Sequence, residues 1–457
     1  MSNKFTHIYF IGVGGIGMSN LARYFSFKGR KVAGYDKTAS ELTKELEAEG
    51  ISVHYEDDIR KIPVDFLDKE HTLIVRTPAV PEDQSELSYF SENGFSVLKR
   101  AQVLGEVSKD DKCLCISGTH GKTTTSMITA HLLKQSHVDC SAFLGGISNN
   151  YETNLLLSDK SELTVIEADE YDRSFHQLQP WMAVVTSVDP DHLDIYYTHE
   201  AYLESFAHFT SLIRPGGSLV IKKGIPLKYR VQEDVKVYTY SSTEIADFYA
   251  TNIRVSNGRL FFDFCRPGAI IKDMELGVPV RINVENAVAA MALAHLNGAD
   301  DEEMRIALAS FKGTRRRFDF QIRRNDFVYI DDYAHHPEEL KASIQSIKEL
   351  FPDKKITGIF QPHLYSRTRD FFNEFAEVLS ELDDLILLDI YPARELPIPG
   401  LTSEMILEKV SIKSKIVTSL SKIIEILDSK QPEVLVTLGA GSIDTIVPLI
   451  KRKFDKC

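Results

Sequence analysis

Cysteine and tryptophan are scarce in this sequence. One tryptophan and five cysteines occur among its 457 residues. Cysteines that are few and odd in number argue against a disulfide framework and favour a reducing compartment. Cys113 and Cys115 are two positions apart, so they point to the same face of a predicted strand. Core packing is therefore a better interpretation of this pair than a disulfide or a zinc site.

Long apolar runs and an excess of positive charge are also missing. No segment approaches about 18 uninterrupted apolar residues, and residues 1–6 are polar and run straight into a predicted strand. We therefore expect no membrane insertion and no signal peptide, but a cytoplasmic protein that is a monomer or a homodimer. The 66 acidic residues outnumber the 53 basic ones, which gives a net charge of −13. This balance argues against nucleic-acid binding and leaves anionic ligands to local basic groups, helix N-termini or metal ions.

The remaining composition is that of a globular protein with several domains. Hydrophobic residues make up 43% and charged residues 26% of the chain, which is long enough for about three domains. Strand and helix signals alternate and restart twice, which predicts three consecutive α/β units built from parallel β-α-β segments. We place them at 1–108, 109–313 and 314–457, with the polar run 108–112 as a linker.

The expected elements follow from apolar runs and their flanking turns. Strands are expected at His7–Ile11, Lys31–Tyr35, Ser52–Tyr55, Leu73–Arg76, Ser96–Leu98, Cys113–Ser117, Leu163–Glu167, Met182–Ser187, Ser218–Lys222, Phe327–Asp331, Ile356–Gln361, Leu385–Asp389 and Glu433–Leu438. Helices are expected near Met18–Lys28, Leu42–Glu49, Thr123–Gln135 and Val284–Leu296, and a β-rich stretch at 235–266.

A glycine-rich turn follows the first strand. It matches G-x-G-x-x-G and opens a helix, and an acidic residue ends the next strand, 19 residues beyond its last glycine. Such glycines let the backbone approach a diphosphate, and such a carboxylate can bind ribose hydroxyls. The turn predicts a site for a nucleotide diphosphate; the alternative is a tight turn without a ligand. The residues concerned are Gly12, Gly14, Gly15, Ile16, Gly17 and Asp36.

A second glycine turn follows the strand Cys113–Ser117. It is shorter than the usual phosphate-binding loop, but the order of strand, turn and helix is the required one. Lys122 would neutralise the β- and γ-phosphates of a nucleotide, and Thr123 would offer its hydroxyl to Mg²⁺. The alternative is a capped helix with a surface lysine. The expected phosphate-binding residues are Gly118, Thr119, His120, Gly121, Lys122, Thr123 and Thr124.

Polar clusters follow several further strands. Glu167–Asp172 and Asp189–Asp194 would lie beside the phosphate loop, where a metal–phosphate complex needs oxygen ligands. A solvated acidic turn, and for His192 a packed loop residue, are the alternatives. In the last third of the chain the clusters are Gly313–Phe318, Asp331–Pro337, Gln361–Arg369 and Asp389–Glu395. Together they predict one active-site rim at the carboxyl edges of the sheets.

Taken in order, these motifs and Asn283–Asn286 resemble the Mur ligase family of peptidoglycan synthesis over nearly the whole chain. The resemblance is strongest to the branch that joins L-alanine to UDP-N-acetylmuramate. It implies a Rossmann-like N-terminal domain for the UDP-sugar, a central P-loop ATPase-type domain with a mixed or parallel sheet, and a Rossmann-like C-terminal domain for the amino acid. The first glycine turn thus becomes a UDP-sugar site rather than an NAD site.

The resemblance also implies roles for single residues, with ATP and Mg²⁺ as cofactors. Lys122 would bind the β- and γ-phosphates, Thr123 and Glu167 would hold Mg²⁺, and His192 would serve a second metal. Asn286 and Arg317 would contact ATP, with Asp332 near its ribose, and His363 and Arg367 would receive L-alanine. The catalytic set is Lys122, Glu167, His192 and Arg367.

Two departures from the family pattern stand out. Ligases that add later residues carry a carbamylated lysine about 15 residues after the metal histidine, but no lysine occurs here between Leu193 and Ile221. Ile282 stands where the alanine-adding branch often has histidine.

Four rival interpretations remain. A recycling ligase that adds a whole tripeptide shares most motifs, and a folate polyglutamate-type ligase shares the phosphate loop but not the N-terminal fingerprint. An NAD-dependent oxidoreductase would explain only Gly12–Asp36, and a non-catalytic nucleotide switch would not need the C-terminal rim.

Overall fold

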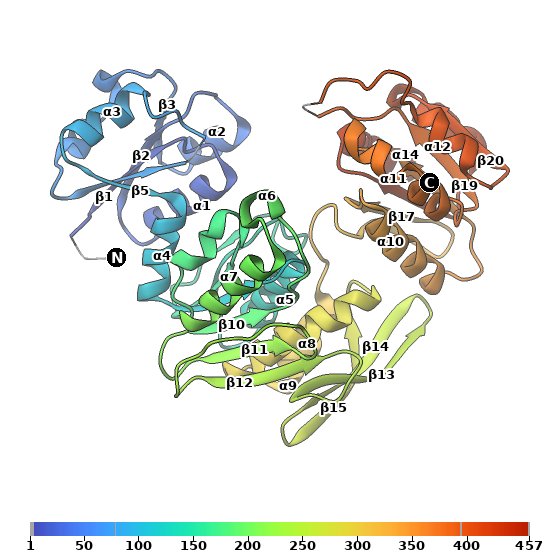
Figure 1. Cartoon of the computed structure of the whole chain (residues 1–457), viewed down its shortest axis with the longest axis horizontal. Coiled ribbons are helices and arrows are strands. Elements are labelled where there is room, and N and C mark those ends of the chain that lie inside the picture. The colour runs from blue at the N-terminus through green and yellow to red at the C-terminus, as the bar shows by residue number, and fades with distance from the viewer. Residues whose placement is uncertain (1–3, 78, 394, 456–457) are drawn as a thin grey trace.

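The N-terminal unit is a parallel sheet of five strands. The structure, a computed structural model, describes residues 4–77, 79–393 and 395–455. The strand order is β3-β2-β1-β4-β5 (Figure 1). The elements are β1 (His7–Ile11), α1 (Ile16–Phe27), β2 (Lys31–Tyr35), α2 (Glu41–Ala48), β3 (Ser52–His54), η1 (Ile59–Lys61), η2 (Val64–Leu67), β4 (Thr72–Arg76), α3 (Ser85–Glu92), β5 (Ser96–Lys99) and α4 (Arg100–Asp110).

The central unit is built on a mixed sheet of ten strands, ordered β15-β14-β13-β12-β11-β10-β6-β9-β7-β8. Its middle strands are parallel, whereas β13, β14 and β15 form an antiparallel meander. The elements are β6 (Lys112–Ser117), α5 (Lys122–Lys134), β7 (Ser141–Phe143), β8 (Leu155–Leu156), β9 (Leu163–Glu167), η3 (Tyr171–Gln177), β10 (Met182–Val185), α6 (Leu193–Tyr196), α7 (His199–Ser211), β11 (Ser218–Lys222), β12 (Lys236–Ser241), β13 (Phe248–Ser256), β14 (Arg259–Arg266), β15 (Ala269–Leu276), α8 (Arg281–Leu296) and α9 (Asp301–Ser310).

The C-terminal unit has a six-stranded sheet in the order β16-β17-β21-β18-β19-β20, parallel except for the edge strand β16. The elements are β16 (Asp319–Arg323), β17 (Val328–Asp332), α10 (Pro337–Leu350), β18 (Ile356–Phe360), α11 (Tyr365–Leu379), β19 (Asp384–Leu388), α12 (Ser403–Lys409), β20 (Ser414–Thr418), η4 (Leu420–Lys422), α13 (Ile423–Lys430), β21 (Val434–Leu438), η5 (Ser442–Ile446) and α14 (Val447–Phe454).

The three-unit α/β organisation is confirmed, while one expected linker is wrong. Ser108 lies in the last turn of α4, where it is fully buried, and only Asp111 separates this helix from β6. Its hydroxyl donates to the carbonyl of Gly105 and accepts from the backbone N–H of Gln179. These polar residues therefore belong to a packed helix end. The exact domain boundaries near 108 and 314 stay predictions.

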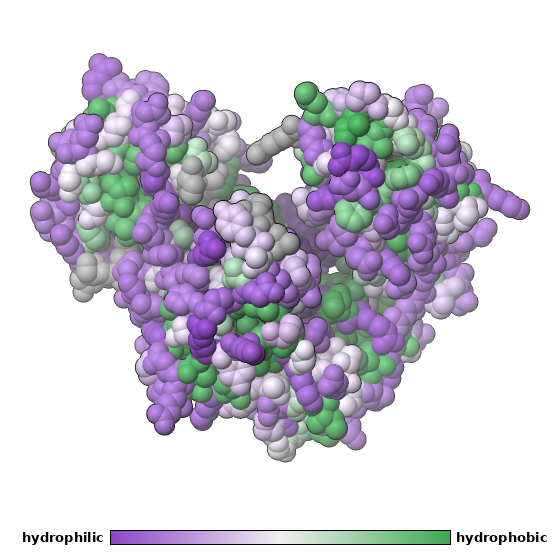
Figure 2. Space-filling view, in the orientation of Figure 1, coloured by the Kyte–Doolittle hydropathy of each residue, from purple (hydrophilic) through white to green (hydrophobic). Residues whose placement is uncertain are grey.

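The N-terminal domain packs on the central domain. The C-terminal domain follows a linker around residues 313–315, which backbone hydrogen bonds hold against the central domain. The Tyr24 ring of α1 contacts the Phe143 ring of β7, with 5.3 Å between their centroids. In the linker, the backbone N–H of Asn149 donates to the carbonyl of Gly313, and that of Arg315 donates to the carbonyl of Ile147. Figure 2 shows a recess between the outer two domains, above the central one.

Two expectations on composition can be checked. Cys113 and Cys115 are free and fully buried in the core, as predicted. Among the described residues, no helix is long and apolar enough to cross a membrane. Cys457 lies outside the described residues.

Candidate active site

The phosphate loop lies between a buried strand and a helix, as the sequence predicts. β6 ends at Ser117 and α5 begins at Lys122. Gly118 and Gly121 have positive φ angles of 140° and 84°, and a Cβ on Gly118 would lie 2.0 Å from Oγ1 of Thr186. Glycine is therefore required here, and it lets the chain turn into a helix N-terminus, which is a suitable site for phosphate.

The loop after β10 supports the phosphate loop from one side. The backbone N–H of His120 donates to Oγ of Ser187 over 2.8 Å. The Thr119 hydroxyl donates to the carbonyl of Asp189 and also lies 3.0 Å from the hydroxyl of Tyr202. The two strand-end motifs thus meet at one edge of the sheet, as expected for neighbouring parallel strands.

Lys122 is bound within the loop and to an acidic residue that the sequence did not single out. Its Nζ donates to the carbonyls of Gly118 (2.7 Å) and Thr119 (3.3 Å), and it forms an ion pair of 2.8 Å with Glu170. The Glu170 side chain is 1% exposed. The acidic run after β9 indicated a carboxylate here, but several neighbours shared that signal, and only the fold shows which of them is buried.

Thr123 and Glu167 form a pair of oxygen donors. The Thr123 hydroxyl donates to Oε1 of Glu167 over 2.9 Å, and the backbone N–H of Gly145 donates to Oε2 over 3.1 Å. Burial raises the pKa of the Glu167 carboxyl, although the Thr123 hydrogen bond and the Lys122 charge favour its ionised form. A hydroxyl beside a carboxylate is the hard-oxygen donor set that Mg²⁺ prefers, so these residues fit that ion.

His192 also lies close to Glu170. Its Nε2 is 3.7 Å from a carboxylate oxygen of Glu170 and 3.7 Å from one of Asp191, and its ring meets Tyr171 edge to face. The backbone at His192 has a φ of 51°, an uncommon left-handed conformation that directs the side chain. The structure therefore brings His192 to Glu170, and through it to Lys122.

A cavity of about 280 Å³ lies between the central and C-terminal domains. Thr124 of the phosphate loop, Arg317 and Asp332 line it together with the apolar Ile282. Burial raises the pKa of the Asp332 carboxyl to about 6. A cavity with one apolar wall, a cation and a carboxylate, next to the phosphate loop, suits a nucleoside.

Asn286 lies beneath the phosphate loop. Its Oδ1 accepts from the hydroxyl of Thr125, and its Nδ2 donates to Oδ1 of Asn283. A Cβ on Gly121 would lie 2.7 Å from Asn286 Oδ1. Both polar ends of Asn286 are thus used within the protein, directly below the turn where ATP phosphates are expected.

A second cavity, of about 440 Å³, joins the N-terminal and central domains. Ile16 and Gly17 of the first glycine turn lie on one side of it, and Glu167 and Asp169 lie on the other. Arg100, the first residue of α4, also lines this cavity and packs against Gly17. This arginine is not among the residues predicted from the sequence, because a single basic residue after a short strand belongs to no motif.

Asp36 holds the first glycine turn in place. Its Oδ2 accepts from the backbone N–H of Gly14 over 2.8 Å, and its Oδ1 accepts from that of Thr38 over 3.0 Å. A Cβ on Gly14 would lie 2.9 Å from the Asp36 carboxylate. In this structure the carboxylate therefore orders the turn that was expected to meet a diphosphate.

His363 and Arg367 come together in the C-terminal domain. The His363 ring stacks on Tyr391, 5.7 Å between centroids, and lies 6.0 Å from the His335 ring. His363 Nδ1 and Arg367 Nη1 are buried, and neither atom has a hydrogen-bond partner among the described residues. Burial lowers the pKa of both histidines, and the Arg367 charge contributes. An unpaired guanidinium N–H beside neutral imidazoles suits a small anionic ligand.

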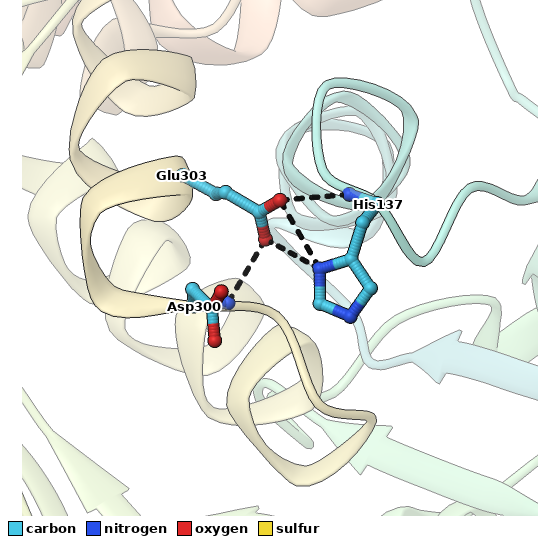
Figure 3. A group of neighbouring side chains, drawn as sticks. All are labelled: His137, Asp300 and Glu303. Atoms are coloured by element: carbon cyan, nitrogen blue, oxygen red, sulfur yellow. Dashed lines mark hydrogen bonds and ion pairs between the residues drawn. The ribbon is translucent and has the colours of Figure 1, made fainter.

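Among the residues that the structure describes, one group of metal-binding residue types lies outside the lining of these cavities (Figure 3). Glu303 accepts hydrogen bonds from the backbone N–H of Asp300 (3.0 Å) and of His137 (2.9 Å), and it also contacts the His137 ring. These bonds cap the N-terminus of α9 and join it to the turn that follows α5. The group therefore has a structural explanation.

Three family profiles cover most of the chain. Residues 7–112 match "Mur ligase family, catalytic domain", residues 116–294 match "Mur ligase middle domain", and residues 316–441 match "Mur ligase, glutamate ligase domain". The chain belongs to the Mur ligase family.

Individual proteins agree with this assignment. A UDP-N-acetylmuramate–L-alanine ligase of Parabacteroides distasonis is 60% identical over 98% of this chain and 97% of its own. The crystal structure of a UDP-N-acetylmuramate–alanine ligase from Thermotoga maritima has a TM-score of 0.78 at 25% identity, covering 98% of this chain and 99% of its own. A murein peptide ligase from Psychrobacter arcticus shares the fold, with a TM-score of 0.61 at 21% identity over 98% of both chains.

Proposed function

We propose that this Mur ligase uses ATP to join the carboxylate of UDP-N-acetylmuramate to the amine of L-alanine, in the cytoplasmic synthesis of peptidoglycan precursors. The position of Glu167 carries the proposal. This residue lines the cavity that begins at the first glycine turn, and it also binds Thr123 of the phosphate loop. A sugar nucleotide held by that turn would thus extend its carboxylate towards the phosphates of ATP.

The reaction requires activation, because a carboxylate is a poor electrophile. A carboxylate oxygen attacks the γ-phosphorus of ATP, the bond to ADP breaks, and an acyl phosphate forms. The amine of alanine then attacks the acyl carbon and loses a proton, and the bond to phosphate breaks. The transferred phosphoryl group develops negative charge, which Lys122 and the N-terminus of α5 stabilise. Mg²⁺ held by Thr123 and Glu167, with His192 near a second ion, would neutralise further phosphate charge.

Residues of the C-terminal domain would bind alanine, whose amine is the nucleophile, and part of ATP. Arg367 would bind the carboxylate of alanine, and Arg317 and Asp332 would bind the nucleoside part of ATP in the neighbouring cavity. An amino acid carries a protonated amine at neutral pH, so a base must remove a proton before attack. The lowered pKa of His363 keeps its imidazole neutral and able to accept that proton.

ADP release with each substrate omitted in turn tests this function. We expect turnover only when ATP, UDP-N-acetylmuramate and L-alanine are all present, and no absorbance change with NAD. Turnover with a tripeptide but not with alanine would instead favour a recycling ligase. Saturable NAD binding by calorimetry without any ATP turnover would contradict the ligase proposal and favour an oxidoreductase.

A further inference from the structure

Glu170 is a buried carboxylate that contacts two predicted functional side chains at once. Its side chain is 1% exposed, yet it meets Lys122 Nζ at 2.8 Å and His192 Nε2 at 3.7 Å. Burial raises the pKa of the carboxyl, whereas the Lys122 charge favours its ionised form. A buried carboxylate without a cation would be costly, so the pair with Lys122 stabilises Glu170 while no phosphate is bound.

A hydrogen bond from α6 fixes the backbone of Glu170. The hydroxyl of the fully buried Tyr196 donates to the carbonyl of Glu170 over 2.5 Å. The Arg173 guanidinium lies over the Tyr196 ring, 4.9 Å from its centroid. Both Asp172 and Arg173 have left-handed backbone conformations, which turn the chain sharply after Glu170. The carboxylate is therefore held at the phosphate loop rather than free to swing towards solvent.

The hydrogen-bonding capacity of Lys122 is already used. An ammonium group has three N–H donors, and Lys122 Nζ donates to the carbonyls of Gly118 and Thr119 and to Glu170. A phosphate oxygen can bind this group only if one of these bonds is given up. If a phosphate oxygen replaces the Glu170 carboxylate as the partner of Lys122, the ammonium group has an anionic partner both with and without nucleotide. Its two hydrogen bonds to the carbonyls of Gly118 and Thr119, which hold the lysine in the loop, remain.

We propose that Glu170 is a positioning residue that holds Lys122 in the loop and gives it up to the nucleotide phosphates when ATP binds. The proposal rests on the nucleotide site of the proposed function. Glu170 and Glu167 thereby have separate tasks: Glu167 is bonded to Thr123 and Gly145, and Glu170 is paired with the lysine. The carboxylate released in the exchange still faces His192.

This exchange makes an unusual prediction for Glu170→Gln. Removing the negative charge removes a competitor for Lys122, so ADP should bind more tightly. We expect about a tenfold lower Kd or more, the equivalent of one charge-assisted hydrogen bond that no longer has to be broken. The measurement is calorimetric titration of the full chain with ADP in EDTA, so that no metal contributes. A purely structural role for Glu170 would weaken binding or leave it unchanged.

Two further variants show whether the tighter ADP binding of Glu170→Gln depends on Lys122. In a Lys122→Ala background, Glu170→Gln should no longer tighten ADP binding, because the competing group is gone. Asp172→Asn removes one exposed negative charge from the same segment and should leave the Kd of ADP unchanged. If Glu170→Gln folds poorly, Glu170→Asp keeps the charge, and it should bind ADP no more weakly than the unaltered protein.

Three results would overturn the proposal. One is an unchanged or higher Kd of ADP in folded Glu170→Gln, and another is an equal tightening in the Lys122→Ala background. The third is a failure of the unaltered protein to bind ADP, which would also remove the nucleotide site. If ADP binds and only the full reaction with sugar nucleotide and alanine is absent, the proposed substrates are wrong while the exchange stands.

Discussion

The hydroxyl of Thr123 donates a hydrogen bond to Oε1 of Glu167, which joins the first turn of α5 to the end of β9. The backbone N–H of Gly145 supplies a second hydrogen bond to the same carboxylate. This pair therefore links the phosphate loop to the wall of the cavity beside the first glycine turn, which Glu167 also lines.

Removing the Thr123 hydroxyl should raise the Mg²⁺ concentration that turnover requires. Thr123→Ala loses one oxygen donor and leaves Glu167 with fewer hydrogen bonds. We expect the Mg²⁺ concentration at half-maximal ADP release to rise about tenfold or more. Thr123→Ser keeps the hydroxyl and is the matched control, with a Mg²⁺ requirement near that of the unaltered protein. An unchanged Mg²⁺ titration of Thr123→Ala would place the metal elsewhere.

Lys122→Ala should lose at least about three decades of turnover, since removing one key electrostatic donor costs roughly 10² to 10³ and this one carries a full charge. Loss of a solvent-facing lysine would leave stability unchanged, but this substitution removes the ammonium group that pairs with the 1% exposed Glu170. We therefore expect destabilisation by about 3 kcal/mol. Denaturant unfolding measures it. Adding Glu170→Gln should restore much of the stability but none of the turnover, and recovered turnover would show that Lys122 was misassigned.

Much of this fold follows from local patterns. Apolar runs with turn residues behind them predicted the strands His7–Ile11, Lys31–Tyr35, Leu163–Glu167 and Ser218–Lys222 with the bounds that the structure shows. Strand β15 was missed because a register irregularity interrupts its apolar alternation: the buried Ile271 and Met274 are three positions apart, and Ile270 is exposed. The polar helix end at Ser108 was misread because one of its hydrogen-bond partners, the backbone N–H of Gln179, is 71 residues away in the chain.

Only those parts of the candidate site that belong to a sequence motif could be predicted. A glycine turn or an acidic run indicates where a strand ends, but it does not indicate which carboxylate is buried. Glu167 and Glu170 are three positions apart in one acidic run, and their different partners depend on β7 and α6 folding around them. Arg100 carries no motif at all, because its relation to Gly17 exists only after α4 packs beside α1.

Bicarbonate should not stimulate turnover. The chain has no lysine between Leu193 and Ile221, so nothing in the family's usual position can be carbamylated. The structure fills this region with the buried aromatic side chains of Tyr202 and Phe206 on α7. ADP release in buffer depleted of carbon dioxide, with and without added bicarbonate, measures the effect. A bicarbonate-dependent rise that disappears when another lysine is mutated would show that this lysine takes the role.

The N-terminal domain should lose stability as the pH rises through 7. Glu86 is fully buried, and the Tyr9 hydroxyl donates to its Oε2, while His54 Nε2 lies 3.3 Å from its Oε1. Burial is the main cause that raises the pKa of the Glu86 carboxyl from 4.5 to about 7; the Asp57 charge acts in the same direction, and the Tyr9 hydrogen bond acts against it. The folded protein therefore binds a proton more strongly than the unfolded chain, so this contribution is complete below about pH 4.5 and is lost as the pH rises through about 7.

Glu86→Gln tests this contribution, because glutamine keeps the shape and stays neutral. The variant should match the unaltered protein near pH 5 and be more stable by about 2 kcal/mol near pH 8. Thermal unfolding at both pH values measures the difference. Glu82→Gln, on an exposed side chain, is the control and should show no such pH dependence. A variant that is equally stable or less stable at pH 8 would show that Glu86 is needed in its ionised form.

Arg367 should bind the carboxylate of L-alanine. Alanine offers only a methyl group, an amine and a carboxylate, so its charged ends must supply most of the binding energy. A guanidinium can donate two parallel hydrogen bonds to a carboxylate, which an ammonium cannot copy. The buried Nη1 of Arg367 has no hydrogen-bond partner among the described residues, and the equally unpaired Nδ1 of His363 belongs to the same segment. A ligand carboxylate would satisfy this donor.

Arg367→Lys should therefore raise the KM for alanine roughly tenfold or more, since a lost charge-assisted hydrogen bond costs about 1.5 to 3 kcal/mol. The KM values for ATP and UDP-N-acetylmuramate should barely change. Arg369, two residues further along α11, is exposed and paired with Asp370, so Arg369→Lys is the matched control and should leave all three values unchanged. The competing Arg394 lies outside the described residues. If the KM for ATP rises instead and that for alanine stays constant, Arg367 belongs to the nucleotide site, and the amino acid must be bound by other residues of the C-terminal domain.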